Sequence, residues 1–164
     1  MANRCSNKLY FTGSEAKVKA VNLFMAEQAA RCATSGGCYI EGTDGYFGDL
    51  MIGKGRFLFD TSWEPDIPTV MAIANRFKVG FVLDYQDSAM SLYGQARYHH
   101  DQLRDTRLNS SDFAEVSAGK QEDTYQYRGQ LFTDDEVLAL YLLKAKIKQE
   151  DAGLSHRQSQ RPTR

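Results

Sequence analysis

The sequence predicts an α+β domain in which an antiparallel sheet carries two helices on one of its faces. Segments of alternating polar and apolar residues recur through the first hundred residues, two amphipathic helical segments separate them, and turn residues join neighbouring strands into hairpins. Alternation at a period of two places successive side chains on opposite faces of a strand. We therefore expect one buried and one polar sheet face.

The N-terminal segment predicts a strand followed by a helix. Residues 5–12 alternate, with Cys5, Asn7, Leu9 and Phe11 on one side of the extended chain, and a glycine ends the run. Residues 15–34 are rich in helix formers and carry apolar residues at a spacing of three and four. The sequence Ser-Gly-Gly then ends this helix.

A hairpin, a second helix and a second hairpin follow. Gly-Lys-Gly at 53–55 joins two alternating segments. Pro65 and Pro68 favour the start of a helix, whose apolar residues continue to Phe77 at helical spacing. Two further alternating segments, 79–86 and 91–98, flank a short polar turn.

The resulting order is strand, helix, strand, strand, helix, strand, with an extra strand at the end. This order is the split βαβ arrangement of ferredoxin-like domains. We therefore predict a ferredoxin-like βαββαβ antiparallel sheet over residues 1–99, with an extra strand hairpin and both helices on one face.

Three stretches also resemble a known family. The opening MANRCSNKLYFTGS resembles the YubB-like ferredoxin-like domains, whose members begin with Met-Ala-Asn, an aromatic residue and Cys-Ser-Asn. The segments FDTSWEPDIPTVMAIANRF and FVLDYQDSAMSLYGQARY are similar to the same family. Arg4 departs from the pattern, because it stands where the family has an aromatic residue. The resemblance implies a protein of a plasmid, phage or conjugative element and transfers no activity, cofactor or catalytic residue.

The rest of the chain divides into three segments. Residues 100–123 are polar and mixed in charge, which predicts a linker or a loosely ordered insertion. Residues 124–149 predict a short strand and a C-terminal helix that packs on the domain or mediates assembly, with Thr133 and Glu136 as a capping box. Residues 150–164 contain few apolar side chains and predict a disordered tail.

Composition narrows the class of partner and the compartment. The formal net charge is −1, from 20 basic and 21 acidic residues, so no field of the whole protein holds the chain on nucleic acid or on an anionic membrane. No stretch approaches the roughly 20 apolar residues of a spanning helix. We therefore expect a cytoplasmic protein. Its three cysteines, Cys5, Cys32 and Cys38, are then expected as reduced thiols, with Cys5 in the core.

Sequence motifs point to no cofactor, metal or catalytic residue. The chain contains no nucleophile elbow, Walker loop, dinucleotide fingerprint or zincin helix. His99 and His100 are adjacent, but no second pair of ligands accompanies them at the spacing of a zinc site. We interpret the two histidines as part of a surface loop.

The sheet face left open by the helices carries the candidate binding residues. They are charged or aromatic residues at the polar positions of the strands: Lys8, Tyr10, Asp60, Asp84, Tyr93 and Arg97. Exposed aromatic and basic side chains on such a sheet can hold single-stranded nucleic acid, although the two acids would repel phosphate. Two aspartates can also bind metal ions, but the first strand lacks the acidic residue of polymerase palms.

We therefore predict a non-enzymatic accessory or interaction protein of a mobile genetic element. It would bind another protein through the sheet face, the edge strand or the C-terminal helix. Two alternatives stay open: single-stranded nucleic-acid binding through the open face, and an enzyme with an acidic metal site around Asp60 and Asp84. The sequence assigns no oligomeric state.

Overall fold

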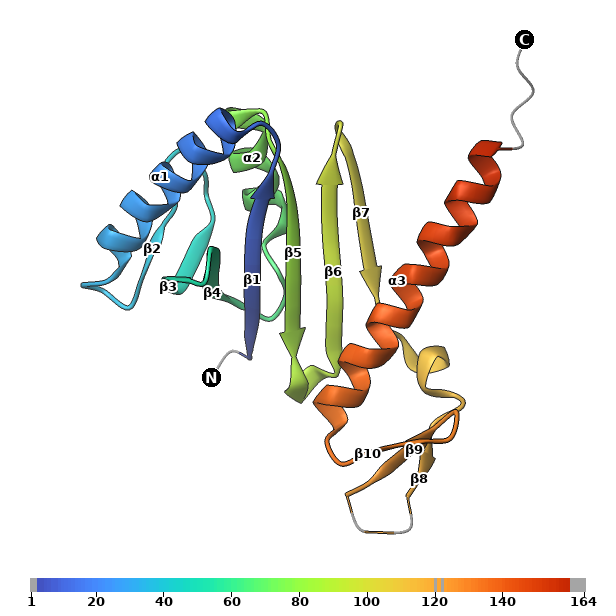
Figure 1. Cartoon of the computed structure of the whole chain (residues 1–164). Helices are drawn as coiled ribbons and strands as arrows, with labels where there is room; N and C mark the ends of the chain where they lie inside the picture. Colours follow the sequence, from blue (N-terminus) through green and yellow to red (C-terminus); the bar gives the residue numbers. More distant parts are fainter. Residues whose placement is uncertain (1–2, 120, 122, 160–164) are drawn as a thin grey trace. The chain divides into compact units, whose positions relative to one another are not determined.

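The computed structural model describes residues 3–119, 121 and 123–159 (Figure 1). The chain forms two compact units, Met1–Asp105 and Thr106–Arg164, and each is described by itself. Among the described residues, no helix combines the length and the apolar character needed to cross a membrane.

Four strands and two helices form the centre of the N-terminal unit. In chain order they are β1 (Arg4–Thr12), α1 (Glu15–Cys32), β3 (Tyr46–Gly53), β4 (Arg56–Ser62), α2 (Ile67–Phe77) and β5 (Gly80–Asp87). The strands lie in the order β3-β4-β1-β5, and all neighbours are antiparallel. This arrangement confirms the predicted ferredoxin-like βαββαβ sheet.

Three further strands widen this sheet to seven. The short strand β2 (Gly37–Tyr39) pairs with β3 at one edge. At the other edge, β6 (Leu92–His99) pairs with β5, and β7 (Gln102–Arg107) follows it (Figure 1). The predicted extra hairpin strand is therefore present, and two strands that the sequence did not predict flank the sheet.

The core lies between one sheet face and the two helices. The buried strand residues are those at the apolar alternation positions, including Leu9 and Leu83, which are fully buried and directly opposite each other. Helix α2 contributes Val70, Ile73 and Ala74 at a spacing of three and one, and the Asp66 side chain caps its first turn by accepting the Thr69 backbone N–H at 3.1 Å. The predicted periodicities of two and 3.6 are both confirmed here.

The structure differs from the sequence prediction over residues 100–123, where we expected a linker or insertion. The segment contains all of β7, the 3-10 helix η2 (Ser110–Phe113) and the short strand β8 (Ser117–Ala118). His100 and Asp101 both take a left-handed backbone (φ 48° and 59°), which makes a tight turn between β6 and β7. An edge strand requires backbone hydrogen bonds more than apolar side chains, so its polar sequence gave little signal.

The C-terminal unit consists of a small sheet and a long helix. Strands β8, β9 (Tyr125–Tyr127) and β10 (Gln130–Phe132) form an antiparallel sheet. Arg128 and Gly129 join β9 to β10 with positive φ at both positions, as a two-residue hairpin turn requires. The sequence predicted one short strand in this region, and the structure contains two.

Helix α3 (Asp135–Ser159) differs from its prediction at both ends. Asp134, rather than Thr133, caps the first turn, because its Oδ1 accepts the Val137 backbone N–H at 3.1 Å. The helix also continues through Ser159, so the predicted tail is helical over 150–159, and residues 160–164 lie outside the described residues. Glu150 accepts a hydrogen bond from the Thr106 hydroxyl at 2.6 Å, which fixes the helix beyond its predicted end.

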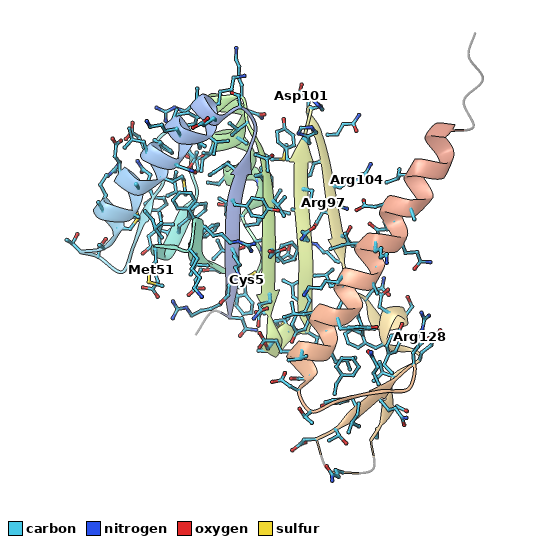
Figure 2. The ribbon with its side chains drawn as sticks, viewed as in Figure 1. Cys5, Met51, Arg97, Asp101, Arg104 and Arg128 are labelled. Atoms are coloured by element: carbon cyan, nitrogen blue, oxygen red, sulfur yellow. A yellow bond between two sulfur atoms is a disulfide. The ribbon has the colours of Figure 1, made fainter. Side chains whose placement is uncertain are left out.

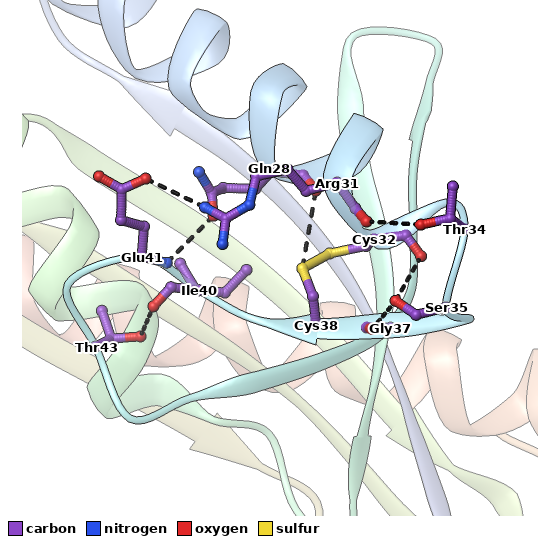
Figure 3. Close-up of a disulfide and its surroundings, with 10 residues drawn as sticks. All are labelled: Gln28, Arg31, Cys32, Thr34, Ser35, Gly37, Cys38, Ile40, Glu41 and Thr43. Carbon is purple, nitrogen blue, oxygen red and sulfur yellow. Dashed lines mark hydrogen bonds and ion pairs between the residues drawn. A yellow bond between two sulfur atoms is a disulfide. The ribbon is translucent and has the colours of Figure 1, made fainter.

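The prediction of three reduced thiols is wrong for two cysteines. Cys32 and Cys38 form a disulfide that joins the end of α1 to β2 (Figure 3). Cys5 is a buried free thiol. Positive φ at Gly36 (70°) and Gly37 (157°) lets the chain reverse sharply between the two cysteines. Their Cα atoms are consequently 4.9 Å apart, within the range that a disulfide spans.

Candidate interaction surface on the open sheet face

The six predicted site residues share the sheet face opposite the core. Lys8 and Tyr10 lie on β1, Asp60 on β4, Asp84 on β5, and Tyr93 and Arg97 on β6. Cross-strand neighbours point to the same face, and the register places Lys8 opposite Asp84 and Ser6 opposite Asp60. Val82 lies opposite both Tyr10 and Arg97, which joins β1 to β6 on this face.

Asp60 is held by an arginine that is not among the six predicted site residues. Arg4 approaches Asp60 at 2.5 Å and forms a second ion pair with Asp49, and the Ser6 hydroxyl donates to Asp60 at 3.1 Å. The hydrogen bond from Arg4 to Asp49, followed by the charge of Asp60, raises the pKa of Arg4. The unusual arginine at position 4 thus serves the open face and not the core.

Asp84 is engaged in the same way on the neighbouring strand. Gln95 Nε2 donates to Asp84 Oδ1 at 2.7 Å, and Arg56 Nη1 lies 3.7 Å from Asp84 Oδ2. The guanidinium of Arg56 also lies 5.1 Å from the centre of the Tyr10 ring, a cation–π geometry. Arg56 therefore links an acid and an aromatic ring that the sequence predicted separately.

These pairings change what the two aspartates can do. A metal ion bound by Asp60 and Asp84 would have to displace Arg4 and Arg56 from their carboxylates. In the part of the chain that the structure describes, no three His, Cys, Asp or Glu side chains gather as a metal site. The arginines also offset the negative charge that argued against phosphate binding on this face.

The aromatic residues of the open face differ in exposure. Tyr10 is half-buried, whereas Tyr93 is only 4% exposed and cannot offer its ring to a base without moving. The large exposed side chains of this face gather instead at its β2–β3 edge. They are Tyr39 (67% exposed), Tyr46 (47%) and Met51 (57%), which we call the edge patch.

A β-bulge brings Met51 to this face. In the pairing of β3 with β4, Gly48 lies opposite Asp60 and Met51 lies opposite Leu58. Between these two pairs, β3 therefore contains one residue more than β4. Asp49, within the bulge, takes a left-handed backbone (φ 47°). Strict alternation would have sent Met51 to the other face, and Figure 2 shows its side chain projecting outward from the sheet.

The two tyrosines of the edge patch pack against each other. Tyr39 and Tyr46 lie directly opposite each other on β2 and β3, with their ring centres 5.3 Å apart and their planes inclined at 73°. A Cβ atom on Gly37 would lie 2.5 Å from the Tyr46 hydroxyl and 2.9 Å from the Phe47 carbonyl oxygen, so a larger residue there would have to shift both the ring and the strand. The Cys32–Cys38 disulfide anchors the strand that carries Tyr39 (Figure 3).

The edge patch and the two arginines, Arg4 and Arg56, were not among the site residues predicted from the sequence. The sequence predicts a hairpin with Gly-Lys-Gly at 53–55, but the bulge shifts the alternation between Gly48 and Met51, so the sequence pattern does not show which face Met51 occupies. The arginines become part of the site only through strand register, which no local pattern shows. A pair of tyrosines on either side of a glycine-rich turn was the one signal present in the sequence.

A comparison with protein families agrees with this architecture. The family model described as "Ferredoxin-like domain in Api92-like protein" matches residues 39–128, which is more than half of the chain. The chain belongs to this family. The matched segment of this Api92-like domain contains the edge patch, α2 and strands β3 to β7, whereas β1 and α1 precede it. Searches of curated proteins and of solved structures found no match.

Proposed function

We propose that the chain is a non-enzymatic accessory or interaction protein of a mobile genetic element and that its edge patch binds another protein. The exposure of Tyr39, Tyr46 and Met51 on one face carries this proposal. Tyrosine and methionine are enriched in the cores of protein interfaces, where they bury much area at little conformational cost. The resemblance of the N-terminal segment to the YubB-like family supports the mobile-element context.

The strand next to the patch indicates how such a partner would bind. Strand β2 is the edge of the sheet and pairs with β3 on one side only within the described sheet. An extended segment of a partner could add to this edge through backbone hydrogen bonds, with its side chains against the two tyrosines. Because β2 has only three residues, most of the affinity would come from the edge patch.

Capture from host lysate tests the proposal. The tagged full chain is compared with a Tyr39→Ser/Tyr46→Ser variant, with and without nuclease, and retained proteins are identified by mass spectrometry. Leu23→Ser is the control, because Leu23 (64% exposed) is about as exposed as Tyr39 (67%) but lies on α1. We expect a stoichiometric protein that survives nuclease, is kept by Leu23→Ser and is lost by the tyrosine variant. A partner that the tyrosine variant retains would contradict a role of the edge patch.

A second function, single-stranded nucleic-acid binding through the open face, has one observation in its favour. Arg4 and Arg56 offset the two aspartates, and Lys8 and Arg97 add positive charge to the same face. This function predicts that a labelled oligothymidine binds and that its affinity falls steeply with salt. A Lys8→Ala/Arg97→Ala variant should lower the salt slope by about one for each of the two side chains that neutralises a phosphate. Lys17→Ala on the exposed side of α1 is the control.

The proposal keeps the cytoplasm as the expected compartment, and the cysteine pair allows a test. Disulfides are rare in cytosolic proteins, so the Cys32–Cys38 pair, which is a disulfide in the structure, tests this compartment by being either a disulfide or two thiols in cells. Rapid acid quenching of cells followed by alkylation and mass measurement distinguishes the two states. Two alkylated cysteines at 32 and 38 would support the cytoplasm, and a persistent disulfide would favour an oxidising compartment.

A further inference from the structure

Helix α3 carries apolar residues on two opposite sides. Leu138, Leu142 and Leu143 are nearly fully buried, at 2%, 4% and 5% exposed. Val137, Leu140 and Tyr141 are 54%, 37% and 41% exposed and recur at a spacing of three and four, so they form a second row on the helix surface. An amphipathic helix that packs on one side only does not need this second row.

The exposed row is continuous with other apolar side chains of the C-terminal unit. The ring centre of Tyr141 lies 5.3 Å from that of Phe132 and 6.1 Å from that of Tyr127, which holds the Tyr141 side chain against the small sheet. Leu131 on β10 is 61% exposed. An apolar patch that is held rigidly loses little conformational entropy on binding, which favours association.

Charges continue the same row toward the C-terminus of the helix. Lys144 and Lys148 follow Leu140 and Tyr141 at helical spacing, and both lysines are exposed. At the other end, Asp134 caps the first turn. We call Val137, Leu140, Tyr141, Lys144 and Lys148 the α3 stripe. With the Asp134 cap, it runs from an acid through apolar residues to bases.

The α3 stripe of one chain therefore complements the α3 stripe of a second chain that runs in the opposite direction, because the acidic end of each meets the basic end of the other. Asp134 stands six residues before Leu140, and Lys148 stands seven residues after Tyr141. If two α3 helices cross in opposite directions with Leu140 and Tyr141 at the centre, Asp134 of each copy lies beside Lys148 of the other. The two helix dipoles are antiparallel in this arrangement, which is electrostatically favourable.

We propose that the α3 stripe binds the α3 stripe of a second copy of this chain and forms a two-fold symmetric, antiparallel dimer. Such an isologous contact needs one surface that complements itself, which the stripe provides. The contact covers about three helical turns and is smaller than a typical permanent interface, so we expect a dissociation constant on the order of 10 μM. The edge patch and the α3 stripe share no residue, so a variant of one surface leaves the side chains of the other unchanged.

Sedimentation of the full chain tests the dimer. We expect the average mass to rise from one chain toward two between about 1 and 200 μM, a range that brackets the expected dissociation constant. Leu140→Glu should weaken the dimer at least tenfold, because it places two carboxylates at the two-fold axis. Gln149→Glu adds the same charge at an exposed position outside the stripe and should leave association unchanged. A wild-type chain that stays monomeric throughout would overturn the proposal.

Two further variants test the dimer independently, in case Leu140→Glu acts by unfolding the chain. Lys148→Glu changes only an exposed position and should also weaken the dimer, because it places like charges at Asp134 of the partner copy. Leu140→Cys should form a disulfide-linked dimer under mild oxidation, whereas Gln149→Cys should not. If Lys148→Glu leaves the dimer unchanged, or if Leu140→Cys and Gln149→Cys cross-link equally well, the chains associate through another surface. Either result would contradict the antiparallel arrangement.

Discussion

The two faces of the seven-stranded sheet are built from the same strands but are stabilised by different interactions. On the helix-covered face, side chains such as Leu9 and Leu83 are fully buried and apolar, and each strand contributes through its own alternation. On the open face, charged residues from different strands pair across the sheet, as Arg4 does with Asp60 and Arg56 with Asp84. The first face is therefore expected to set stability, and the second to set recognition.

The sharpest test of this contrast removes a side chain from the covered face. Leu9→Ala empties a fully buried position on the central strand, opposite Phe57 on one side and Leu83 on the other. We expect the free energy of unfolding to fall by about 2–5 kcal/mol, measured by urea denaturation. Lys8→Ala on the same strand is the control, and a loss as large as that of Leu9→Ala would refute the division between the faces.

The buried thiol of Cys5 predicts a pH dependence from the covered face. Burial raises its pKa from 9.0 to about 11. Between these values the unfolded chain loses the proton while the folded chain keeps it, so stability should fall as the pH rises from about 9 to 11, by at most roughly 2–3 kcal/mol. A Cys5→Ala variant should lack this part of the decline. Parallel curves for the two proteins would show that the thiol does not contribute.

A glycine at the edge of the covered face offers a third test. Gly94 lies opposite Tyr85, and a Cβ atom there would come within 2.2 Å of the tyrosine ring. Tyr85 cannot move freely, because its hydroxyl donates to Asp105 at 2.5 Å. Gly94→Ala should therefore cost about 1–3 kcal/mol of stability. Gly153→Ala on α3 has open space around it and should instead stabilise by about 0.5–1 kcal/mol, which makes it a control of opposite sign.

The smallest effect on stability is expected from the open face. Arg56 and Asp84 are each more than one-third exposed and are 3.7 Å apart, so Arg56→Ala should change the unfolding free energy by only about 0–1 kcal/mol. The difference should shrink further in 1 M salt. A loss above about 2 kcal/mol would show that the Arg56 contacts with Tyr10 and Asp84 are structural and would remove the contrast between the faces.

Much of the fold could be predicted from the sequence because its signals are local. Alternation over residues 5–12 and the spacing of apolar residues in α2 depend only on the geometry of a single strand or helix. The prediction failed where a signal was polar or lay between segments. Strand β7 needs backbone pairing rather than apolar side chains, and the extension of α3 beyond residue 149 depends in part on Thr106, far away in the chain.

The sequence by itself determined which side chains lie on each face of the central strands, since a period of two follows from extended backbone geometry. It therefore placed Lys8, Tyr10, Asp60 and Asp84 on one surface correctly. Only the tertiary structure decided which of these groups meet. Register paired Arg4 with Asp60, a bulge turned Met51 outward, and a reversal of the chain joined Cys32 to Cys38. Each of these features depends on contacts between segments that are distant in the sequence, and the free energy of such contacts cannot be evaluated from one segment alone.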